Sequence, residues 1–330
     1  MVELKGKTVL VTGGSGFIGS HLVEALHRRG AKVRVMVFYE TGPNLGCLNS
    51  LPPEVRASLD IVHGDIKNAD DVRLAAAGAR VIFHLAALVG IPYSYLHPRH
   101  VVETNTIGTL NVLVAGKDLG VEKVVHTSTS EAYGTARYAP IDEEHPLQGQ
   151  SPYSASKIGA DKLAESFHRS FGFPVATIRP FNQYGPRQSA RAVIPTIISQ
   201  CLTGDEIQLG SLHPLRDFTF VEDTVDGFLR IAEADASVGE VINIGSGTEI
   251  SIGDLARKVV QIVGKPIRIK SKDERVRPEK SEVGRLLCDN AKAKRLVGWE
   301  PRTTLDEGLS RTIDWIGRNL GIYDPRRYAV

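Results

Sequence analysis

The most constraining feature of this 330-residue chain is an apolar strand that runs directly into a glycine-rich turn near the N-terminus. The strand is the β-branched run at residues 8–11, and residues 12–19 read Thr-Gly-Gly-Ser-Gly-Phe-Ile-Gly. An amphipathic helix follows and ends near Gly30. This order of elements aims the N-terminus of a helix at a pyrophosphate. The sequence therefore predicts a dinucleotide site whose phosphate-binding turn contains Gly13, Gly16, Phe17, Ile18 and Gly19.

Strand-like and helix-like segments alternate through the first 180 residues, which predicts a doubly wound parallel α/β sheet. Further strands are expected at residues 33–38, 59–63, 81–87, 124–127, 175–179 and 241–245. Helices are expected near residues 252–263, 291–296 and 305–318. Prolines, glycines and arginines become frequent from Pro180. We therefore expect residues 1–180 and 218–246 to form a Rossmann domain, and residues 181–217 and 247–330 to form a smaller α/β lobe that binds substrate.

The second predicted strand ends without the acidic residue that usually binds the adenosine ribose. Val37 occupies that position, and Phe38 and Tyr39 follow it. No arginine comes next to pair with a 2′-phosphate, so NAD is expected in preference to NADP. After the third strand, Asp65 is expected either to accept a hydrogen bond from the adenine amino group or to cap the next helix.

Other cofactor contacts are predicted at the ends of strands and in one helix that runs to about residue 119. They are Ile66, Leu85, Ala86, Ala87, Asn105 and Thr127. Asn105 lies among apolar residues of that helix, so its amide needs a buried partner. His84, inside the fourth strand, is expected to be a satisfied core histidine. His97 and His100 have no third candidate ligand near them in sequence, so no metal is expected.

Residues 126–160 combine a hydroxyl and carboxylate run with a Tyr-x-x-x-Lys pair. Tyr153 and Lys157 share one face of a helix that begins near Pro152. A lysine ammonium one turn away is expected to lower the pKa of the phenol and make Tyr153 a general base. The pair alone is common on amphipathic helices. Together with the residues that follow the fifth strand, it predicts a catalytic site containing Thr129, Ser130, Glu131, Tyr153 and Lys157.

The composition indicates which partners to expect. A net charge of +2, spread along the chain, gives no sign of nucleic-acid or membrane binding. No signal-like or membrane-length apolar segment is present, so a cytoplasmic protein is expected. Cys47, Cys201 and Cys288 fit neither a disulfide framework nor a zinc cluster and are expected to be inert thiols. Several loop arginines suit a diphosphate, namely Arg187, Arg191, Arg216 and Arg277.

With the glycine turn, Thr129, Tyr153 and Lys157 all in place, the sequence resembles the extended short-chain dehydrogenases/reductases over essentially its whole length. Residues 129–134, 179–182 and 216–218 look like the nucleotide-sugar enzymes of that family. Residues 140–143, 148–157, 187–195 and 277–283 are most similar to NAD-dependent 4,6-dehydratases acting on nucleotide-linked N-acetylglucosamine.

The resemblance implies conversion of UDP-N-acetylglucosamine to its 4-keto-6-deoxy derivative, with UDP expected more than GDP. Tyr153 would take the 4-hydroxyl proton as hydride passes to NAD, Thr129 would hold that oxygen, and Glu131 would remove the C5 proton as water leaves. NAD is regenerated each cycle and so is expected to be tightly held. A homodimer through the helices at residues 100–118 and 152–170 is implied. The implied sugar-nucleotide contacts are Asn182, Arg187, Arg191, Val193, Arg216, Arg277 and Glu279.

One departure leaves other chemistries open. Many sugar 4,6-dehydratases carry Asp-Glu where this chain has Ser130 and Glu131, and UDP-glucuronate decarboxylases share the Thr-Ser-Glu form. A decarboxylase and a 4-epimerase on the same scaffold are therefore alternatives. A non-catalytic nucleotide-sensing module is an alternative of another class. It is disfavoured because such a module would not need Thr129, Glu131, Tyr153 and Lys157 together.

Overall fold

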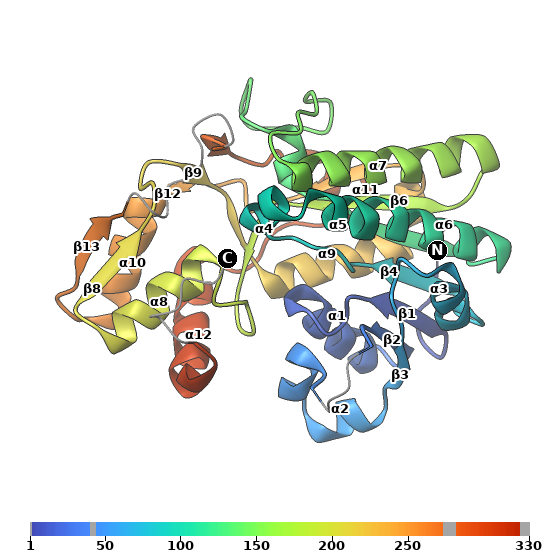
Figure 1. Ribbon diagram of the computed structural model, residues 1–330, viewed down its shortest axis with the longest axis horizontal. Coiled ribbons are helices and arrows are strands. Elements are labelled where there is room, and N and C mark those ends of the chain that lie inside the picture. The colour runs from blue at the N-terminus through green and yellow to red at the C-terminus, as the bar shows by residue number, and fades with distance from the viewer. Residues whose placement is uncertain (1, 40–43, 273–281, 324–330) are drawn as a thin grey trace.

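The computed structural model describes residues 2–39, 44–272 and 282–323, which form two lobes lying side by side (Figure 1). The larger lobe is built on a seven-stranded parallel sheet with the order β11-β6-β5-β4-β1-β2-β3. Its strands are β1 (Thr8–Thr12), β2 (Lys32–Val37), β3 (Asp60–His63), β4 (Val81–His84), β5 (Lys123–Thr127), β6 (Val175–Pro180) and β11 (Val241–Ile244). The order reverses between β1 and β4, and ligands of such sheets bind at the carboxyl ends of the strands there. The predicted doubly wound fold is confirmed.

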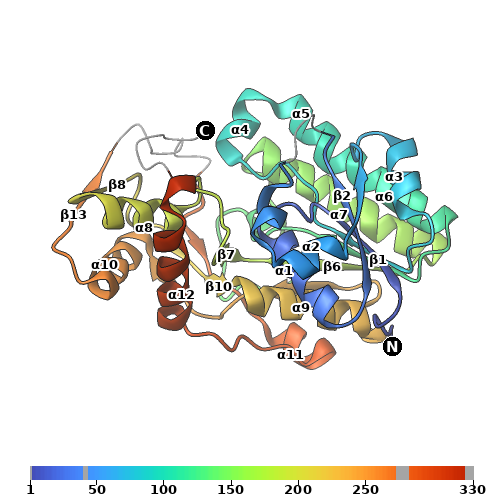
Figure 2. The same cartoon turned by 90° about the horizontal axis from the view of Figure 1, so that it is seen from below.

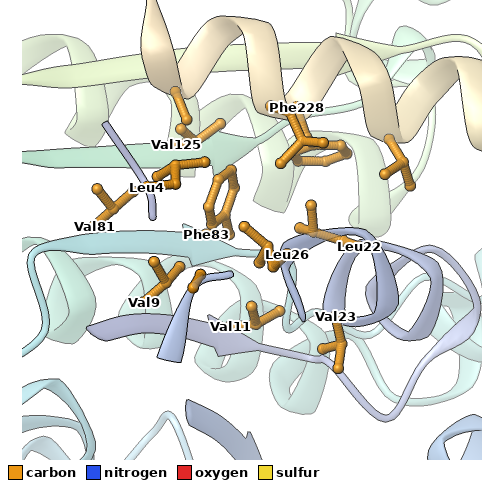
Figure 3. Packing of buried hydrophobic residues seen from close by; sticks show 14 of the residues in the cluster. Leu4, Val9, Val11, Leu22, Val23, Leu26, Val81, Phe83, Val125 and Phe228 are labelled. Atoms are coloured by element: carbon orange, nitrogen blue, oxygen red, sulfur yellow. The ribbon is translucent and has the colours of Figure 1, made fainter. Parts of the chain in front are cut away.

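Helices cover both faces of the sheet because the strands are apolar on both sides. α1 (Phe17–Arg28) and α9 (Val221–Glu233) bury their apolar stripes on one face. α3 (Ala69–Ala76), α6 (Gly108–Asp118) and α7 (Pro152–Phe171) cover the other face. Figure 3 shows Phe83 of β4 between Phe228 of α9 and Leu26 of α1. The two phenyl rings meet edge to face, with centroids 6.4 Å apart.

The helix predicted to run to about residue 119 is interrupted. It begins with α5 (Pro98–Val102), passes through the π-helical turn η2 (Glu103–Ile107) and continues as α6, and a separate short helix, α4 (Ile91–Leu96), precedes it. Single π-helical turns occur frequently at functional sites. Asn105 lies in this turn and is fully buried.

The smaller lobe has its own core, formed by Ile197, Leu255, Leu309 and their neighbours. The parallel pair β7 (Asn182–Tyr184) and β10 (Phe218–Phe220) joins it to the sheet lobe. Its other main elements are α8 (Val193–Thr203), β8 (Glu206–Leu209), β9 (Leu215–Arg216), β12 (Ile250–Ser251), α10 (Ile252–Val263), β13 (Arg268–Ser271), β14 (Arg285–Leu286) and α12 (Leu305–Arg318). Short elements elsewhere are η1 (Gly46–Ser50), α2 (Pro53–Ala57), η3 (Ser130–Tyr133), η4 (Asp235–Ser237) and η7 (Leu320–Ile322).

One segment packs in the other lobe from the one expected. α11 (Ala291–Val297) packs against β11 and α9, and Figure 2 shows it beside α9. Ala293 and Trp299 belong to the core cluster of the sheet lobe, and the Trp299 indole N–H donates to the carbonyl of Asp223 at 2.8 Å. The expectation that residues 247–330 all belong to the smaller lobe therefore fails at 291–299. An amphipathic pattern predicts a buried face but does not identify the partner.

Among the described residues, no helix combines the length and the apolar character needed to cross a membrane.

Candidate active site

The glycine turn after β1 has the geometry that a dinucleotide phosphate requires. Gly13 adopts a left-handed φ of 72°, and a Cβ there would lie 2.6 Å from the backbone nitrogen of Ala86. A Cβ on Gly19 would lie 2.2 Å from the Gly13 carbonyl oxygen. Both positions therefore need glycine so that α1, β1 and the end of β4 can approach closely. Ala86 also donates its N–H to the Thr12 hydroxyl at 3.3 Å.

The N-terminus of α1 offers free donors at this turn. Gly16 is the N-cap, no side chain caps the helix, and no acidic residue lies in its first turn. The first backbone N–H groups, starting at Phe17 and Ile18, have no partner within the helix and suit an anion. Within the described residues, the hydroxyl oxygen of Thr127 at the end of β5 is buried without a partner. This cradle fits the pyrophosphate and ribose hydroxyls of a dinucleotide.

The residues after β3 contradict one of the two predictions made for Asp65. The N-cap of α3 is Asn68, whose side chain accepts from the N–H of Asp70 at 3.0 Å. Asp65 instead accepts from the N–H of Lys67 at 2.9 Å, so the helix-cap reading is wrong and the adenine contact stays a prediction. Ile66 points into the core against Gly108, where a Cβ would lie 2.6 Å from its Cδ1.

Val37 closes β2 with its side chain 4% exposed in the core. Leu85, Ala86 and Ala87 follow β4 directly, and Leu85 donates its N–H to the Thr12 carbonyl at 3.1 Å. These residues thus lie at the carboxyl end of β4 beside β1, where the strand order reverses. Direct contact of these residues with the cofactor remains a prediction.

Asn105 has the buried partners that its position demanded. Its side-chain oxygen accepts from the Leu88 N–H at 2.7 Å, and its amide donates to the Leu88 carbonyl at 3.0 Å and to the Ser156 hydroxyl at 2.9 Å. The amide therefore ties the loop after β4 to α7. Direct contact of Asn105 with the cofactor stays a prediction.

His84 is the satisfied core histidine that was expected. Its Nδ1 lies 2.8 Å from the Thr12 hydroxyl and its Nε2 lies 3.0 Å from the Thr109 hydroxyl. Because Thr109 donates to the Asn105 carbonyl at 2.6 Å, it must accept from His84. The Nε2 atom of His84 therefore carries a proton. Burial lowers the pKa of this imidazole well below its usual range.

The Tyr153 and Lys157 side chains lie on one face of α7, as predicted. Ser151 caps the helix in a reciprocal capping box with Ser154, which fixes the first turn where Tyr153 lies. Both side chains are buried, at 7% and 3% exposure. The Tyr153 phenol hydrogen-bonds to Thr129. Thr129 also accepts from the Glu131 N–H at 3.2 Å, so one threonine touches both halves of the predicted machinery.

The predicted effect on the Tyr153 pKa has the wrong sign in the protein alone. Burial raises the pKa of Tyr153 to about 12; the Thr129 hydrogen bond lowers it, and the Glu131 charge raises it. Burial also lowers the pKa of Lys157 to about 8, while Asp161 raises it. Desolvation outweighs the attraction between phenolate and ammonium because both groups are taken out of water. A cation bound near Tyr153 would stabilise the phenolate and lower the pKa of the phenol.

Ser130 and Glu131 lie in η3, directly after β5 and Thr129. This turn is anchored by Tyr133, whose hydroxyl donates to the Asn243 side chain at 2.8 Å. The guanidinium of Arg179 lies 4.6 Å from the centroid of the Tyr133 ring. Ser130 is buried and Glu131 is half-buried. Glu131 is therefore held beside the Thr129 and Tyr153 pair on a turn with fixed supports.

The substrate residues predicted from sequence occupy different places. Asn182 begins β7 with its side-chain oxygen buried and unpartnered within the described residues. Arg216 in β9 is buried and donates to Glu282 at 3.2 Å. Arg191 is exposed, and Val193 begins α8. Arg277 and Glu279 lie outside the described residues.

Arg187 lies against the cofactor lobe. It is a non-glycine residue in the left-handed region, with φ 69°, and it donates to Glu24 of α1 at 2.8 Å. His21 of the same helix binds the Pro186 carbonyl at 2.9 Å. Among the described residues, Nε and Nη1 of Arg187 are buried without partners. Arg187 therefore bridges the lobes and keeps two nitrogen donors for an anion.

Asp217 is a supporting residue that the sequence did not single out. It is fully buried, and its carboxylate accepts from the Ser246 N–H at 2.7 Å, the Gly247 N–H at 2.9 Å and the Cys288 N–H at 3.1 Å. Its own carbonyl accepts from the Asn182 N–H at 3.1 Å. It thus holds Asn182 and Arg216 between three segments. Its position next to Arg216 was the only signal in the sequence.

The three cysteines show no sign of reactivity. Burial raises the pKa of the Cys47, Cys201 and Cys288 thiols, most strongly for Cys288. A thiol held protonated is a poor nucleophile and a poor metal ligand.

The family model described as GDP-mannose 4,6 dehydratase matches residues 10–312 of this chain. Two curated relatives that are similar to this chain have different activities. A dTDP-glucose 4,6-dehydratase of Streptomyces antibioticus is 34% identical, over 96% of this chain and 94% of its own. UDP-glucuronic acid decarboxylase 1 of Xenopus tropicalis is 32% identical, over 96% of this chain and 74% of its own.

Solved structures share the fold closely. The dTDP-glucose 4,6-dehydratase DesIV of Streptomyces venezuelae, with NAD and TYD bound, superposes with a TM-score of 0.87 at 31% identity, covering 97% of this chain and 100% of its own. A UDP-N-acetylglucosamine 4-epimerase of Methanobrevibacter ruminantium M1, in complex with UDP-N-acetylmuramic acid, gives 0.87 at 30% identity, over 96% and 99%. This chain therefore belongs to the GDP-mannose 4,6 dehydratase family, within the extended short-chain dehydrogenases/reductases that act on nucleotide sugars.

Proposed function

We propose that this protein is an NAD-dependent nucleotide-sugar 4,6-dehydratase that converts UDP-N-acetylglucosamine to its 4-keto-6-deoxy derivative. The observation that carries the proposal is the double contact of Thr129, to the Tyr153 phenol and to the backbone of Glu131. Together with the effect of the Glu131 charge on the Tyr153 pKa, it supports a role for the Glu131 carboxylate close to Tyr153. Elimination of water needs a base for the C5 proton, whereas rotation of a 4-keto sugar does not.

The side chains divide the reaction between them. The glycine turn after β1 would hold the NAD pyrophosphate, and bound NAD would supply a hydride acceptor for C4, a hydride donor for C6 and a positive charge that favours the Tyr153 phenolate. Tyr153 takes the proton of the 4-hydroxyl, and Thr129 holds that oxygen. The resulting ketone acidifies C5, and Glu131 removes the C5 proton. The C6 hydroxyl leaves as water with the proton that Glu131 took from C5, and Ser130 can hydrogen-bond it. When hydride is returned to C6, C5 takes up a proton, matched by the one that Tyr153 took from the 4-hydroxyl and releases, so only water is lost overall. Lys157 supplies positive charge beneath the phenol.

Glu131→Gln tests the dehydratase assignment. The variant should still reduce bound NAD when mixed with UDP-N-acetylglucosamine, because Tyr153 is untouched. It should form product roughly 10²–10⁴-fold more slowly, as expected when a general base is lost. Absorbance of reduced nicotinamide and product mass report the two steps separately. Ser130→Ala is the neighbouring control and should lose much less. A Glu131→Gln variant that dehydrates at nearly the parental rate contradicts the assignment.

A decarboxylase acting on UDP-glucuronate is the second candidate. It is favoured by Ser130, which replaces the aspartate of many dehydratases, and by the decarboxylase among the relatives. An epimerase is the third. Incubating the protein with UDP-N-acetylglucosamine, UDP-glucuronate and UDP-glucose, and weighing the products by mass spectrometry, separates loss of water, loss of carbon dioxide and no change in mass.

The cofactor is NAD. NADP is disfavoured because no arginine directly follows Val37. The nucleotide released from purified protein on denaturation should therefore be NAD, and recovery of NADP would contradict this. The sugar nucleotide carries UDP in preference to GDP, with Asn182, Arg216 and the free N–H groups of Arg187 near its diphosphate. Because these substrates are made in the cytoplasm, that compartment is proposed for the protein.

We also propose a homodimer formed through α5, η2, α6 and α7. Large apolar side chains are exposed there, namely Val102, Ile107, Val114 and Phe171, at 40–60% exposure. Light scattering should give a molecular mass of two chains for the parental protein and of one chain for Ile107→Glu. Leu74→Glu on α3, also at an exposed leucine, is the control and should leave the mass unchanged. A parental protein of single-chain mass would contradict the dimer.

A further inference from the structure

The helix that carries Tyr153 and Lys157 places a third ionisable side chain at the next equivalent position. Asp161 follows Lys157 by one helical turn, so the three side chains lie along one face of α7. All three are buried, and Asp161 is 6% exposed. A buried carboxylate beside a buried ammonium affects the charge of the ammonium more strongly than an exposed one does.

Three donors, from β5, the residue after β5 and β6, hold the Asp161 carboxylate. Arg179 Nη2 donates at 2.7 Å, the Ser128 hydroxyl at 2.6 Å, and His126 Nε2 at 3.1 Å. Arg179 Nε also donates to the Ser128 oxygen at 3.2 Å, which closes the network. Although burial alone would raise the pKa of Asp161, Arg179 and His126 hold it well below its usual range. The carboxylate is therefore a fixed negative charge.

The nearby histidines do not neutralise this charge. His126 Nε2 faces a carboxylate, so it carries the proton, and its Nδ1 is buried without a partner within the described residues. Burial lowers the pKa of His126. His84 stacks on it with ring centroids 5.8 Å apart and is also neutral. The charged groups of the network are therefore Asp161, Arg179 and Lys157.

We propose that Asp161 is a positioning residue that keeps Lys157 protonated, and thereby sets the pH at which the Tyr153 and Lys157 pair gives up its proton. His126, Ser128 and Arg179 keep the carboxylate ionised in that place. The proposal rests on the proposed function only where kinetics are measured. It requires that the reaction begins by oxidation at C4, which dehydratase, decarboxylase and epimerase share.

Side chains from other elements also surround the Tyr153 and Lys157 pair. The helical face of α5, η2 and α6 presents the uncharged Asn105 and Thr106 to α7, both bonded to Ser156. The titratable or charged groups that surround the pair from other elements are His84 of β4, His126 of β5, Glu131 and Tyr133 of η3, and Arg179 of β6. Within the described part of the chain, it is Asp161 of α7 itself, and none of these groups, that raises the pKa of Lys157.

The test removes the Asp161 charge without leaving Arg179 buried and unpaired. Asp161→Asn alone leaves Arg179 buried and unpaired, which can cost several kcal/mol and prevent folding. The double variant Asp161→Asn with Arg179→Met removes both charges and keeps the arginine stem volume. Asp161→Glu keeps the charge and serves as the rescue. Circular dichroism and retained NAD check that each variant is folded.

The first readout needs no substrate. Lysine ε-¹³C resonances of the holoprotein are followed against pH, and the Lys157 signal is assigned by its loss in Lys157→Arg. In the double variant, the Lys157 titration should move to lower pH by about 1 unit, the scale of effect expected from a nearby charge. In Asp161→Glu it should stay close to the parental value.

The second readout is the rate at which bound NAD is reduced on mixing with whichever of UDP-N-acetylglucosamine, UDP-glucuronate and UDP-glucose the parent oxidises. Removing an anion favours proton loss from both Tyr153 and Lys157, so the rising limb of the rate against pH should move to lower pH. A merely structural role would lower the rate without moving the limb.

Three outcomes would overturn the proposal. The Lys157 titration in the double variant could be unchanged from the parent, or it could be displaced to higher pH. The third outcome is a Lys157 titration in Asp161→Glu that moves as far to lower pH as in the double variant. If none of the three sugar nucleotides reduces bound NAD, the proposed function fails. The resonance titration still decides the role of Asp161 in that case.

Discussion

The Tyr153 hydroxyl is a single atom whose removal should stop catalysis and spare the fold. Tyr153→Phe deletes the base and the hydrogen bond to Thr129 but keeps the ring packed against Ile91 and Val101. Turnover should fall by roughly 10²–10⁴-fold or more while NAD remains bound. Product mass spectrometry and the absorbance of bound nicotinamide measure the two effects. Tyr138→Phe, at an exposed tyrosine bonded to Asp142, is the control and should keep parental activity. Activity of Tyr153→Phe within a few-fold of the parent would contradict the assignment of Tyr153 as the catalytic base.

Gly13 combines a left-handed backbone with a close approach, and two variants separate these demands. Gly13→Ala brings a Cβ to 2.6 Å from the Ala86 nitrogen, whereas Gly78→Ala, with a φ of 75°, meets nothing within 4 Å. Gly78→Ala should therefore cost only the left-handed strain of about 1–2 kcal/mol. Gly13→Ala should lose more stability and also lose NAD, because the turn and the end of β4 must separate.

Urea unfolding and the NAD content of purified protein measure these losses. Equal losses in the two variants, with NAD retained in both, would mean that the close approach at Gly13 is unimportant.

At the level of single residues, the sequence predicted those whose spacing is local and missed those whose partners come from other strands. Tyr153 and Lys157 are four residues apart on one helix, so their shared face followed from helical geometry. Asp161 has the same spacing, yet its three donors come from β5, β6 and the residue after β5. Only the folded sheet brings them together. The Tyr153 pKa was predicted in the wrong direction because burial cannot be read from a pair of residues.

Helix α7 depends on its N-cap for catalysis as well as for stability. Ser151→Ala removes one half of the capping box and should cost about 1 kcal/mol. It should also lower kcat, because Tyr153 lies in the first turn. Thr304→Ala removes the equivalent capping box of α12, far in sequence from the catalytic turn, and should lose similar stability with unchanged kcat. Urea unfolding and steady-state rates distinguish the two. A Ser151→Ala variant with parental kcat would show that the first turn is held by packing alone.

Among the elements, the regular ones followed from periodicity. The helices expected at residues 252–263 and 305–318 have those bounds in the structure. The π-helical turn at Glu103–Ile107 was not foreseen, because an inserted residue in a continuous helix leaves the apolar pattern almost unchanged. α4 was missed for a different reason. It is six residues long, too short for periodicity to identify.

The contact between the two lobes predicts how the whole molecule responds to acid. His21 of α1 donates to the Pro186 carbonyl, and burial together with Arg187 lowers its pKa to about 4. The unfolded chain has the ordinary histidine value, so between about pH 6.5 and 4 the unfolded state binds more protons. Stability contributed by neutral His21 is therefore complete above that window and is lost as the pH falls through it.

His21→Gln keeps a donor for Pro186 but cannot titrate. Its free energy of unfolding should fall less steeply between pH 7 and 5, by up to about 1.4 kcal/mol per pH unit relative to the parent. Urea unfolding at both values measures the slope. The exposed His213→Gln should follow the parental slope. Identical slopes for the parent and His21→Gln would contradict the role of this contact.

The return of Trp299 to the sheet lobe has a consequence for protein engineering. After its first passage into the smaller lobe, the chain goes back to build α9 and β11, leaves again, and comes back once more with α11 before it forms α12 in the smaller lobe. No single cut yields a complete lobe on either side. A chimera made to change sugar specificity must therefore keep residues 291–299 with the recipient sheet. Excising residues 1–180 as a portable cofactor module would leave the Phe83 side of the sheet without Phe228 and Trp299, and such a fragment should expose this surface and aggregate.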